Sequence, residues 1–415
     1  MIKNLINELK DKKIVILGFG REGRDTLLFL KKLFPKKKIG IADRKLSKDY
    51  LKNLDKYDVI IKSPGIPFKI LPRSVLGRIT SQTEIFFDNC PGKIIGITGT
   101  KGKSTTASLI YDILKAGKIK AHLVGNIGKP VLNLLPSAPF AAARVKDVYV
   151  YELSSFQLTN LKKSPHIAVL LNIYQEHLDY YRSFKEYAQA KANITLHQTK
   201  DDFLIYNSTD KLVSQIAKKT KAKIIPIKGG YYNLDRQAAK KVGKLFKIPK
   251  EKIEKAINNF KPLPHRLEPV GTYRGVTFYN DSLATIPEAT IAALDILGDR
   301  VETIFLGGFD RKIDFKGLAK RVLHSKIKNI ILFPTSGKRI WEALRLTSFA
   351  QGKKLPKHYF LDNMQKAVKL AYKYTGKGKI CLLSCASPSF GLFKDYAERG
   401  DLFKKYVKKF GISKR

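Results

Sequence analysis

Residues 96–106 read Gly96-Ile97-Thr98-Gly99-Thr100-Lys101-Gly102-Lys103-Ser104-Thr105-Thr106, a glycine-rich turn between two predicted elements. A short apolar strand over residues 93–98 leads into the turn, and a helical pattern over residues 105–115 follows it. Such a turn points its backbone N–H groups at one spot, where the helix N-terminus adds positive potential. Lys103 can then reach the outer phosphates of a nucleotide, and the Ser104 hydroxyl can bind Mg²⁺. The stretch therefore predicts a phosphate-binding loop for ATP or GTP.

The loop departs from the general P-loop pattern at one place. That pattern has Gly five residues before Gly102, where this chain has Ile97. An accidental Gly-, Lys- and Thr-rich turn is the alternative, but the strand, the turn and the helix follow one another in the required order. The shortened form Gly-Thr-x-Gly-Lys-Ser-Thr, with Lys101 as x, resembles the loop of the Mur ligases and the folylpolyglutamate synthetases. The resemblance implies an enzyme that forms amide bonds at the expense of ATP.

Length and composition indicate a globular protein of two or three domains. The chain has 415 residues, 44% of them hydrophobic, which is enough for that many cores. It has no run of about 18 apolar residues, so no membrane span is predicted. The charged N-terminus leads directly into a strand and lacks the pattern of a signal peptide. Cys90, Cys381 and Cys385 do not make a disulfide framework, so a reduced cytoplasm is the simplest location.

The net charge is extreme, at +44 from 79 Lys and Arg against 35 Asp and Glu. It could indicate nucleic-acid binding or a solvated, lysine-rich surface. The charges are spread along the whole chain, and short clusters such as Lys36-Lys37-Lys38 occur in every third of it. Neither zinc-finger spacing nor an aromatic RNA-binding signature accompanies them. We therefore expect no nucleic-acid partner, although a positive field would also attract anionic small substrates.

Alternating strand and helix patterns predict an α/β fold of three domains. Residues 1–92 are expected to form an N-terminal Rossmann-like domain, residues 93–262 a central P-loop ATPase domain with a mostly parallel sheet, and residues 263–415 a C-terminal Rossmann-like α/β domain. Pro262 and Pro264 suit a linker at the second boundary. The predicted strands are residues 14–17, 38–42, 59–61, 147–153, 167–173, 303–306, 329–333 and 380–383. Those over 147–153 and 167–173 are near-continuous apolar runs, as in parallel sheets covered on both faces.

The first predicted strand ends in a second glycine-rich turn, Gly18-Phe19-Gly20-Arg21-Glu22-Gly23, and the next strand ends at Asp43. Gly-x-Gly-x-x-Gly with an acid about 20 residues later is the dinucleotide fingerprint. Taken alone it would indicate an NAD(P) oxidoreductase. The motif is weak by itself, because any tight strand-to-helix turn near a phosphate can use it. An oxidoreductase would also have no use for the phosphate-binding loop downstream.

Three further residues are candidates for metal binding or catalysis. Glu152 stands at the end of an apolar strand, where a carboxylate beside a phosphate-binding loop can bind Mg²⁺; a surface Glu is the alternative. His177 follows another strand and lies next to carboxylates, so it could bind a metal or transfer a proton, although a lone His usually does neither. Lys191 lies in a helical stretch over residues 187–194, where a solvated lysine is the ordinary expectation.

Over nearly its whole length the chain is similar to the Mur ligase family, and most of all to the glutamate-adding branch of that family. No single motif decides this, but their joint order does. The motifs are residues 18–23, Ser63-Pro64-Gly65, the phosphate-binding loop, Gly125-Asn126-Ile127-Gly128, Glu152-Leu153-Ser154-Ser155-Phe156-Gln157, residues 172–179, Lys191, residues 263–268, Asn280-Asp281-Ser282, Leu306-Gly307-Gly308 and residues 389–400.

The resemblance implies a role for five sets of residues. Those around the uridine diphosphate of the substrate would be Gly20, Arg21, Gly23, Arg44 and Gly65, with Asn126 at the sugar-peptide portion. ATP would be held by Gly99, Thr100, Lys101, Gly102, Lys103, Ser104 and Thr105, and across the domain boundary by Asn233, Arg266 and Asp281. Two Mg²⁺ ions would be bound by Ser104, Glu152, His177 and Lys191, the last carbamylated by CO₂. The catalytic residues would be Lys103, His177 and Lys191. The incoming amino acid would contact Thr285, Arg311, Ser389, Phe390 and Tyr396.

The same resemblance implies a monomeric, cytoplasmic ligase of peptidoglycan precursor synthesis. It would join glutamate to UDP-N-acetylmuramoyl-L-alanine through an acyl phosphate made from ATP, with D-glutamate as the expected isomer. Leu283 and Arg311 replace lysines of the family, and Arg236 and Cys385 depart from its pattern too. Some ligases with comparable changes add L-glutamate, so that alternative stays open. Another Mur or folylpolyglutamate-type ligase is the second; the Rossmann-like first domain argues against a folate enzyme, and the lack of Asp-Asn-Pro-x-Arg against a diaminopimelate-adding one.

Overall fold

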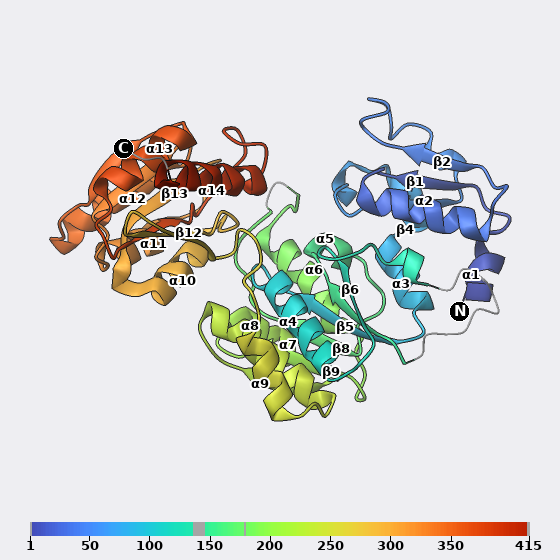
Figure 1. Ribbon diagram of the computed structural model, residues 1–415. Coiled ribbons are helices and arrows are strands. Elements are labelled where there is room, and N and C mark those ends of the chain that lie inside the picture. The colour runs from blue at the N-terminus through green and yellow to red at the C-terminus, as the bar shows by residue number, and fades with distance from the viewer. Residues whose placement is uncertain (1, 136–145, 178–179, 413–415) are drawn as a thin grey trace. The chain divides into compact units, whose positions relative to one another are not determined.

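The computed structural model describes residues 2–135, 146–177 and 180–412, which separate into two compact units (Figure 1). The first unit is Met1–Phe260 and the second is Lys261–Arg415, so the break falls two residues before the predicted boundary after residue 262. The described residues form three sheets, one in each predicted domain, and the α/β prediction is confirmed. The boundary expected after residue 92 falls inside the first unit and stays a prediction.

The first sheet is small and parallel, with the order β2-β1-β3-β4. Its central strand, β1, is the apolar run Ile14-Val15-Ile16-Leu17, whose side chains are all buried. The turn after β1 leads directly into α2, and a Cβ on Gly23 would lie 2.2 Å from the Gly18 carbonyl oxygen. The elements are α1 (Ile2–Leu9), β1 (Ile14–Leu17), α2 (Arg21–Leu33), β2 (Ile39–Ala42), β3 (Val59–Lys62), β4 (Ile79–Thr80) and α3 (Gln82–Asn89).

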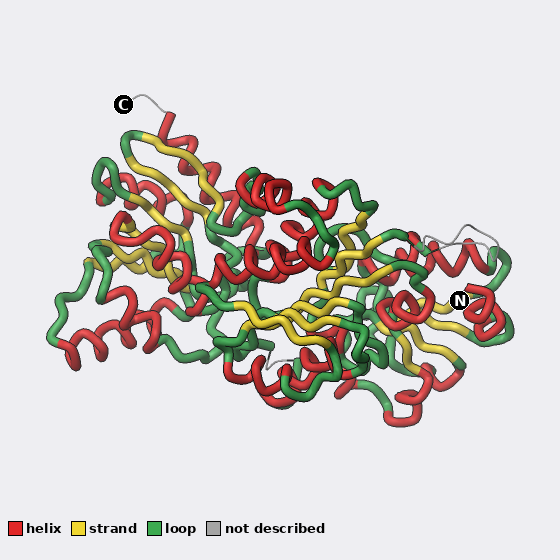
Figure 2. The backbone as a smooth tube through the Cα atoms, turned by 90° about the horizontal axis from the view of Figure 1, so that it is seen from below, coloured by secondary structure: helices red, strands yellow, loops and turns green. Residues whose placement is uncertain are grey.

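The central sheet has six parallel strands in the order β10-β9-β8-β5-β7-β6. In Figure 2 its strands, drawn in yellow, run between red helices. The strands are β5 (Lys93–Thr98), β6 (Ala121–Gly125), β7 (Val148–Glu152), β8 (Ile167–Leu170), β9 (Phe203–Asn207) and β10 (Lys223–Ile227). The helices are α4 (Lys103–Ala116), α5 (Ser155–Leu158), α6 (Phe184–Leu196), α7 (Lys211–Ala217), α8 (Tyr231–Leu245) and α9 (Lys250–Asn258).

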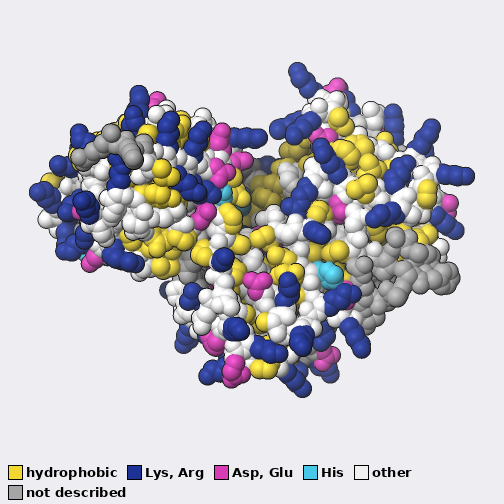
Figure 3. All heavy atoms as spheres, in the orientation of Figure 1, with side chains coloured by type: hydrophobic (Ala, Val, Ile, Leu, Met, Phe, Trp, Pro, Cys, Tyr) yellow, Lys and Arg dark blue, Asp and Glu magenta, His cyan; other side chains and the backbone are white. Residues whose placement is uncertain are grey.

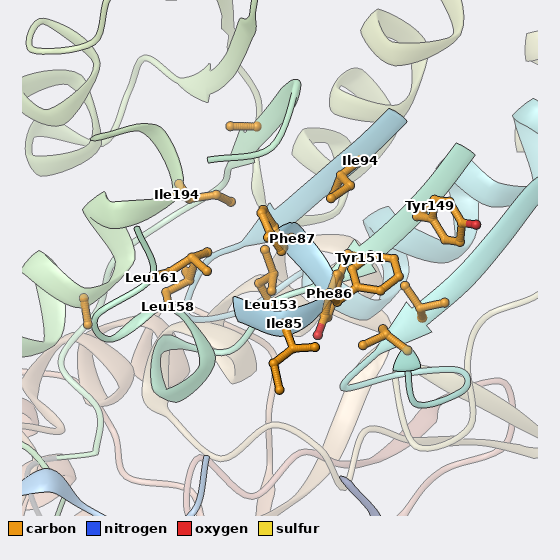
Figure 4. Packing of buried hydrophobic residues seen from close by; sticks show 14 of the residues in the cluster. Ile85, Phe86, Phe87, Ile94, Tyr149, Tyr151, Leu153, Leu158, Leu161 and Ile194 are labelled. Atoms are coloured by element: carbon orange, nitrogen blue, oxygen red, sulfur yellow. The ribbon is translucent and has the colours of Figure 1, made fainter. Parts of the chain in front are cut away.

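Both faces of the central sheet are buried, as its apolar strands predict. Alternate residues of β7 belong to different cores: Val148 and Val150 pack with α4, α8 and α9, and Tyr149 and Tyr151 pack with α3 and α6. Figure 4 shows the second of these cores, where the Phe86 ring meets Tyr149 and Tyr151 edge-on at 5.2 and 5.8 Å. That core also contains residues of β1 and α2, so it joins the first sheet to the central one.

The second unit has one six-stranded mixed sheet in the order β11-β12-β16-β13-β14-β15. The pair β11–β12 is antiparallel and the other neighbours are parallel. Arg274 and Gly275 join that pair with φ values of 52° and 81°, the two positive values that a type I′ hairpin turn needs. The elements are β11 (Glu268–Tyr273), β12 (Val276–Asn280), α10 (Pro287–Leu297), β13 (Val301–Gly307), α11 (Lys316–Leu323), β14 (Asn329–Phe333), α12 (Gly337–Gln351), β15 (Lys357–Phe360), α13 (Met364–Tyr374), β16 (Ile380–Leu383) and α14 (Tyr396–Ile412).

Most of the lysine and arginine side chains lie on the surface of the two units, and Lys62, Lys191 and Arg399 are buried exceptions. In Figure 3 the Lys and Arg side chains, drawn in dark blue, are scattered over the visible face and are not gathered in one patch. This distribution agrees with the spread of the +44 charge along the sequence. Within the described part of the chain, no helix combines the length and the apolar character that a membrane crossing requires.

Candidate active site

The phosphate-binding loop lies between β5 and α4, and its backbone conformation depends on glycine. Gly102 is the N-cap of α4 with a φ of 88°, which L side chains rarely adopt. A Cβ at this position would also lie 2.4 Å from Asp235 Oδ1. Asp235 accepts a hydrogen bond of 2.9 Å from the Thr106 hydroxyl and so ties α8 to α4. Asp235 was not predicted from the sequence, although it lies two residues from the predicted Asn233.

The other side of the loop is fixed by the segment after β8. Asn172 Oδ1 accepts a hydrogen bond of 2.9 Å from the Lys101 N–H, and the Thr100 hydroxyl accepts one of 2.9 Å from the Tyr174 N–H. Lys103 Nζ donates to the Gly99 and Thr100 carbonyl oxygens at 3.0 Å each. A phosphate in the loop would offer this ammonium a charged acceptor, which makes a stronger hydrogen bond than a carbonyl.

Three other predicted ATP contacts in the first unit differ in exposure. Ser104 is buried and Thr105 is half-buried, both in the first turn of α4. Asn233 is exposed in the first turn of α8. The nearby Arg236 is exposed as well.

Lys191 reaches the loop from α6 and is 2% exposed. Its Nζ donates to the Gly99 carbonyl oxygen at 2.8 Å, the same oxygen that Lys103 contacts. It also lies 4.9 Å from the centroid of the Tyr187 ring. Burial first, and then the neighbouring Lys103, lower the pKa of Lys191 well below its ordinary value, although Glu176 and Glu152 oppose the shift. The amine is therefore neutral more often than that of a solvated lysine.

Glu176 and His177 face the loop from the segment after β8. Glu176 is buried and accepts a hydrogen bond of 3.1 Å from Lys101 Nζ. Burial alone would raise its pKa, but Lys101, His177 and Lys103 outweigh burial and lower the pKa to about 2. His177 has a φ of 60°, and its Nε2 lies 3.6 Å from Glu176 Oε2. His177 was predicted from the sequence and Glu176 was not; Asp179, in the same motif, lies outside the described residues.

Glu152 ends β7 and is 1% exposed. Its Oε1 accepts a hydrogen bond of 3.1 Å from Asn126 Nδ2. Among the described residues its Oε2 is buried without a hydrogen-bond partner, which is costly unless a cation or another donor binds there. No three His, Cys, Asp or Glu side chains of the described chain are grouped closely enough to hold a metal. The donors fit Mg²⁺, which commonly takes one or two carboxylates and completes its shell with substrate phosphates and water.

A cavity of about 310 Å³ within the first unit brings many of these residues together. One wall of the cavity carries Lys103, Lys191, Glu176 and His177. The remaining walls come from the first sheet, from the turn after β6 and from α5. Their lining residues include Glu22, Pro64, Gly65, Asn126, Ser154, Ser155, Phe156 and Gln157. The cavity therefore extends from the first sheet to the phosphate-binding loop.

Only two of the residues expected to contact the UDP-substrate line this cavity. Gly65 and Asn126 line the cavity, and Gly20 and Arg44 are exposed. The Arg21 guanidinium donates to the carbonyl oxygens of Gly125 and Gly128. Gly23 is buried against Gly18, so the close approach of helix α2 to the turn accounts for that glycine.

The acid of the dinucleotide fingerprint has a structural role. Asp43 Oδ2 accepts a hydrogen bond of 2.6 Å from the Phe19 N–H, and its Oδ1 accepts one of 2.8 Å from the Lys45 N–H. These backbone hydrogen bonds lower the pKa of Asp43. Asp43 therefore stabilises the glycine-rich turn, and this structural role does not require a dinucleotide.

The remaining candidates lie in the second unit, and many of them surround the loops after β12 and β16. Asp281 accepts hydrogen bonds from the Leu267 N–H at 3.0 Å and the Ser384 hydroxyl at 2.8 Å. Arg399, which sequence analysis missed, is 0% exposed and donates to the Ser282 and Ser387 carbonyl oxygens at 2.6 and 3.1 Å. Ser389 is buried, Phe390 and Tyr396 are exposed, and Arg266, Thr285 and Arg311 are half-buried.

Two protein families match this chain, and together they span most of it. The family described as Mur ligase middle domain matches residues 97–258. The family described as Mur ligase, glutamate ligase domain, matches residues 265–387.

Similar proteins cover nearly the whole chain. UDP-N-acetylmuramoylalanine–D-glutamate ligase from Acetivibrio thermocellus is 32% identical over 96% of this chain and 97% of its own length. The enzyme of the same name from Clostridium acetobutylicum is 31% identical over 96% and 97%. The crystal structure of MurF ligase from Thermotoga maritima in complex with ADP has a TM-score of 0.59 at 16% identity and covers 97% of each chain; it shows the shared fold alone. With a phosphate-binding loop, a buried lysine beside it and these relatives, the chain belongs to the Mur ligase family.

Proposed function

We propose that this protein joins D-glutamate to UDP-N-acetylmuramoyl-L-alanine, at the expense of ATP, in the synthesis of peptidoglycan precursors. The observation that carries the proposal is the cavity in which Gly65 and Asn126 of the expected substrate site lie together with Lys103 and Lys191. The names of the relatives at 31–32% identity support the substrate and the isomer. Their coverage of about 97% of the relatives' own length supports the transfer of the whole activity.

The reaction has two steps. The carboxylate of the alanyl residue attacks the γ-phosphate of ATP, so that an acyl phosphate forms and ADP leaves. The amine of D-glutamate then attacks the acyl carbon, loses a proton and displaces inorganic phosphate as the amide forms. Lys103 would stabilise the charge that spreads over the transferring phosphoryl group. Thr285, Arg311, Ser389, Phe390 and Tyr396 remain the proposed contacts of the glutamate.

Mg²⁺ would bind at Glu152 and Ser104, with His177 and a carbamylated Lys191 at a second ion. When bound, the metal ions neutralise phosphate charge. The buried Glu152 Oε2, which lacks a hydrogen-bond partner in the described chain, supports the first site. The lowered pKa of Lys191 supports the modification, because only a neutral amine can attack CO₂. The neutral amine would form the carbamate with release of one proton, and Lys191 would then be an anionic ligand beside Lys103.

Three further expectations accompany this function. We propose a cytoplasmic location, because nucleotide-linked precursors and ATP are found there, and a monomeric state. Nucleic acid is not proposed as a partner, since the basic side chains are scattered over the surface (Figure 3). Gel filtration with light scattering would test the oligomeric state.

The test of the activity is phosphate release from ATP in the presence of UDP-N-acetylmuramoyl-L-alanine, with D-glutamate and L-glutamate in separate reactions. We expect release with the D isomer alone. Release with the L isomer alone would replace the proposed isomer and give Leu283 and Arg311 a role in selecting it. Release with neither isomer would contradict the proposed substrate pair.

Gly65→Ala is expected to weaken binding of the UDP-substrate without harming the fold. A Cβ at Gly65 would meet no atom within 4 Å, so the added methyl group costs nothing in the free protein. Because Gly65 lines the cavity, the methyl group would crowd bound substrate, and overpacking of this kind typically costs about 1–3 kcal/mol. We expect KM for the UDP-substrate to rise about tenfold with kcat and Tm nearly unchanged.

Gly77→Ala is the matched control for Gly65→Ala. A Cβ at Gly77 also meets nothing within 4 Å, and Gly77 lines a different cavity. Its KM should equal that of the wild type. Equal KM values for both variants would remove Gly65 from the proposed substrate site.

A further inference from the structure

Glu22 is an acidic side chain in the wall of the active-site cavity, and the proposed mechanism does not use it. It lies in the first turn of α2, two residues after the N-cap Gly20, and it lines the cavity with Gly65 and Asn126. A helix N-terminus that follows a glycine-rich turn is where this kind of fold binds phosphate. The anionic UDP-substrate would therefore pass close to a carboxyl group.

The Glu22 side chain is fixed in that wall by a neutral partner. Its Oε1 accepts a hydrogen bond of 2.7 Å from Gln157 Nε2. Gln157 is itself held, because its Oε1 accepts hydrogen bonds from the N–H and hydroxyl of Ser154 at 2.9 and 3.0 Å. The Glu22 backbone is also held in place, since its carbonyl oxygen accepts hydrogen bonds from the Gln82 side chain and the Thr26 hydroxyl. The Glu22 side chain therefore cannot move away from an incoming anion without breaking its hydrogen bond between α2 and α5.

None of the charged side chains described around Glu22 forms an ion pair with its carboxyl group. On its own helix, the Arg21 guanidinium donates to Gly125 and Gly128, and Asp25 is a second acid. From β3, Lys62 Nζ donates to the Ser63 and Ile66 carbonyl oxygens at 3.1 and 2.9 Å. From β7, Tyr151 lies close enough for its pKa to be raised by Glu22. Within the described chain, Glu22 takes part in no salt bridge.

Burial is the dominant influence on this carboxyl group. It raises the pKa of Glu22 to about 7, while Gln157, Arg21 and Lys62 act in the opposite direction and Asp25 adds to the rise. Burial has the opposite effect on the pKa of Lys62, which it lowers to about 8. A diphosphate or carboxylate that enters the cavity would favour the uncharged form of Glu22 further.

We propose that Glu22 is a positioning residue for the UDP-substrate that acts as a carboxylic acid, so that binding of this anionic substrate transfers one proton from solvent to the Glu22 carboxylate. The inference rests on the proposed function, because it needs that substrate. In the bound state the acid keeps its contact with Gln157 and can donate a hydrogen bond to the substrate. The sign of the pH dependence follows: the ionised fraction of free Glu22 grows as pH rises through 7, and affinity falls.

The test is calorimetric binding of UDP-N-acetylmuramoyl-L-alanine at pH 7.5–8 in buffers of different ionisation enthalpy, which gives the number of protons taken up. The substrate's diphosphate is a diester and has no group that titrates near pH 7. We expect the wild type to take up nearly one proton at pH 8 and to bind about tenfold more weakly there than at pH 6, because one pH unit above a pKa leaves about a tenth of the group protonated.

Glu22→Gln supplies the discriminating comparison, since an amide keeps the shape and the hydrogen bond to Gln157. We expect it to lose that proton uptake, to show a flat affinity between pH 6 and 8, and to bind more tightly than the wild type at pH 8. Glu84→Gln is the control: burial also raises the pKa of Glu84, which lines other cavities, and this variant should behave as the wild type.

Two outcomes would overturn the inference, and a third would count against the function beneath it. Equal proton uptake by wild type and Glu22→Gln would place the proton elsewhere, for example on Lys62. Weaker binding by Glu22→Gln at every pH would mean that the carboxylate itself is required. Failure of the wild type to bind the UDP-substrate at all would contradict the proposed function. Either of the first two outcomes would overturn the role of Glu22 and leave the proposed function intact.

Discussion

Replacing Lys103 with alanine is expected to reduce phosphate release from ATP by at least about a thousandfold. Positively charged groups that stabilise a transferring phosphoryl group are worth about 10³–10⁵ in rate. Lys103 begins α4, and its ammonium lies against the loop carbonyls of Gly99 and Thr100. The loss should fall on kcat in the phosphate-release assay with D-glutamate, because the charge is needed mainly in the transition state.

Lys115→Ala is the matched control for Lys103→Ala. Lys115 lies on the same helix, is exposed, and places its ammonium over the Tyr111 ring at 5.4 Å. Its removal should leave kcat within about twofold of the wild type, since an exposed substitution away from the site has little effect. Both variants should give the far-ultraviolet circular dichroism of the wild type. Substantial turnover by folded Lys103→Ala would contradict a phosphate-binding role for this loop.

Much of the fold could be predicted because strands, helices and turns leave patterns within short stretches of the sequence. β1 and β5 were predicted with the bounds that the structure has, since each is an apolar run followed by a glycine-rich turn. α4 begins at Lys103, two residues before the predicted helix, because Gly102 rather than the first apolar residue caps it. The β11–β12 hairpin was not predicted, since its turn is Arg274-Gly275 and not a familiar Asn-Gly pair.

The contacts that shape the site could be predicted less well, because they join distant segments. Lys101 and Glu176 are 75 residues apart, Thr106 and Asp235 are 129 apart, and Glu22 and Gln157 are 135 apart. None of these pairs has a spacing or a composition that marks it in the sequence. The role of Asp43 also depends on tertiary structure, because the fingerprint is the same whether the acid faces a ribose or the turn. The burial of Lys191 could not be predicted either, because a lysine in a helical stretch is ordinarily expected to be solvated.

Lys191→Ala is expected to reduce turnover by more than about a hundredfold, since even the partners that orient metal ligands are worth about 10–100-fold. Added bicarbonate should not restore this variant, because no amine remains to attack CO₂. Acetate should restore part of the activity, since it can enter the space left by the side chain and supply a carboxylate to the metal. Full activity without any additive would contradict the proposed carbamate.

Lys185→Ala on the same helix is the control for the acetate effect. Lys185 is exposed in the first turn of α6, so this variant should keep wild-type turnover and show no response to acetate. Wild-type protein should in addition lose activity when CO₂ and bicarbonate are removed and regain it when they return. Insensitivity of the wild type to CO₂ would leave Lys191 as an amine and remove the modification from the mechanism.

Lys191→Met separates a chemical role of this lysine from a structural one. A lysine that is 2% exposed, with its pKa lowered by burial and by Lys103, adds an unfavourable buried charge unless it is neutral or modified. Methionine has a similar length and no charge, so Tm measured by calorimetry should stay the same or rise. Activity should nevertheless be lost, and acetate should restore less of it than in Lys191→Ala, because the methionine side chain fills the space. A large fall in Tm would assign Lys191 to the stability of the loop, through its hydrogen bond to Gly99.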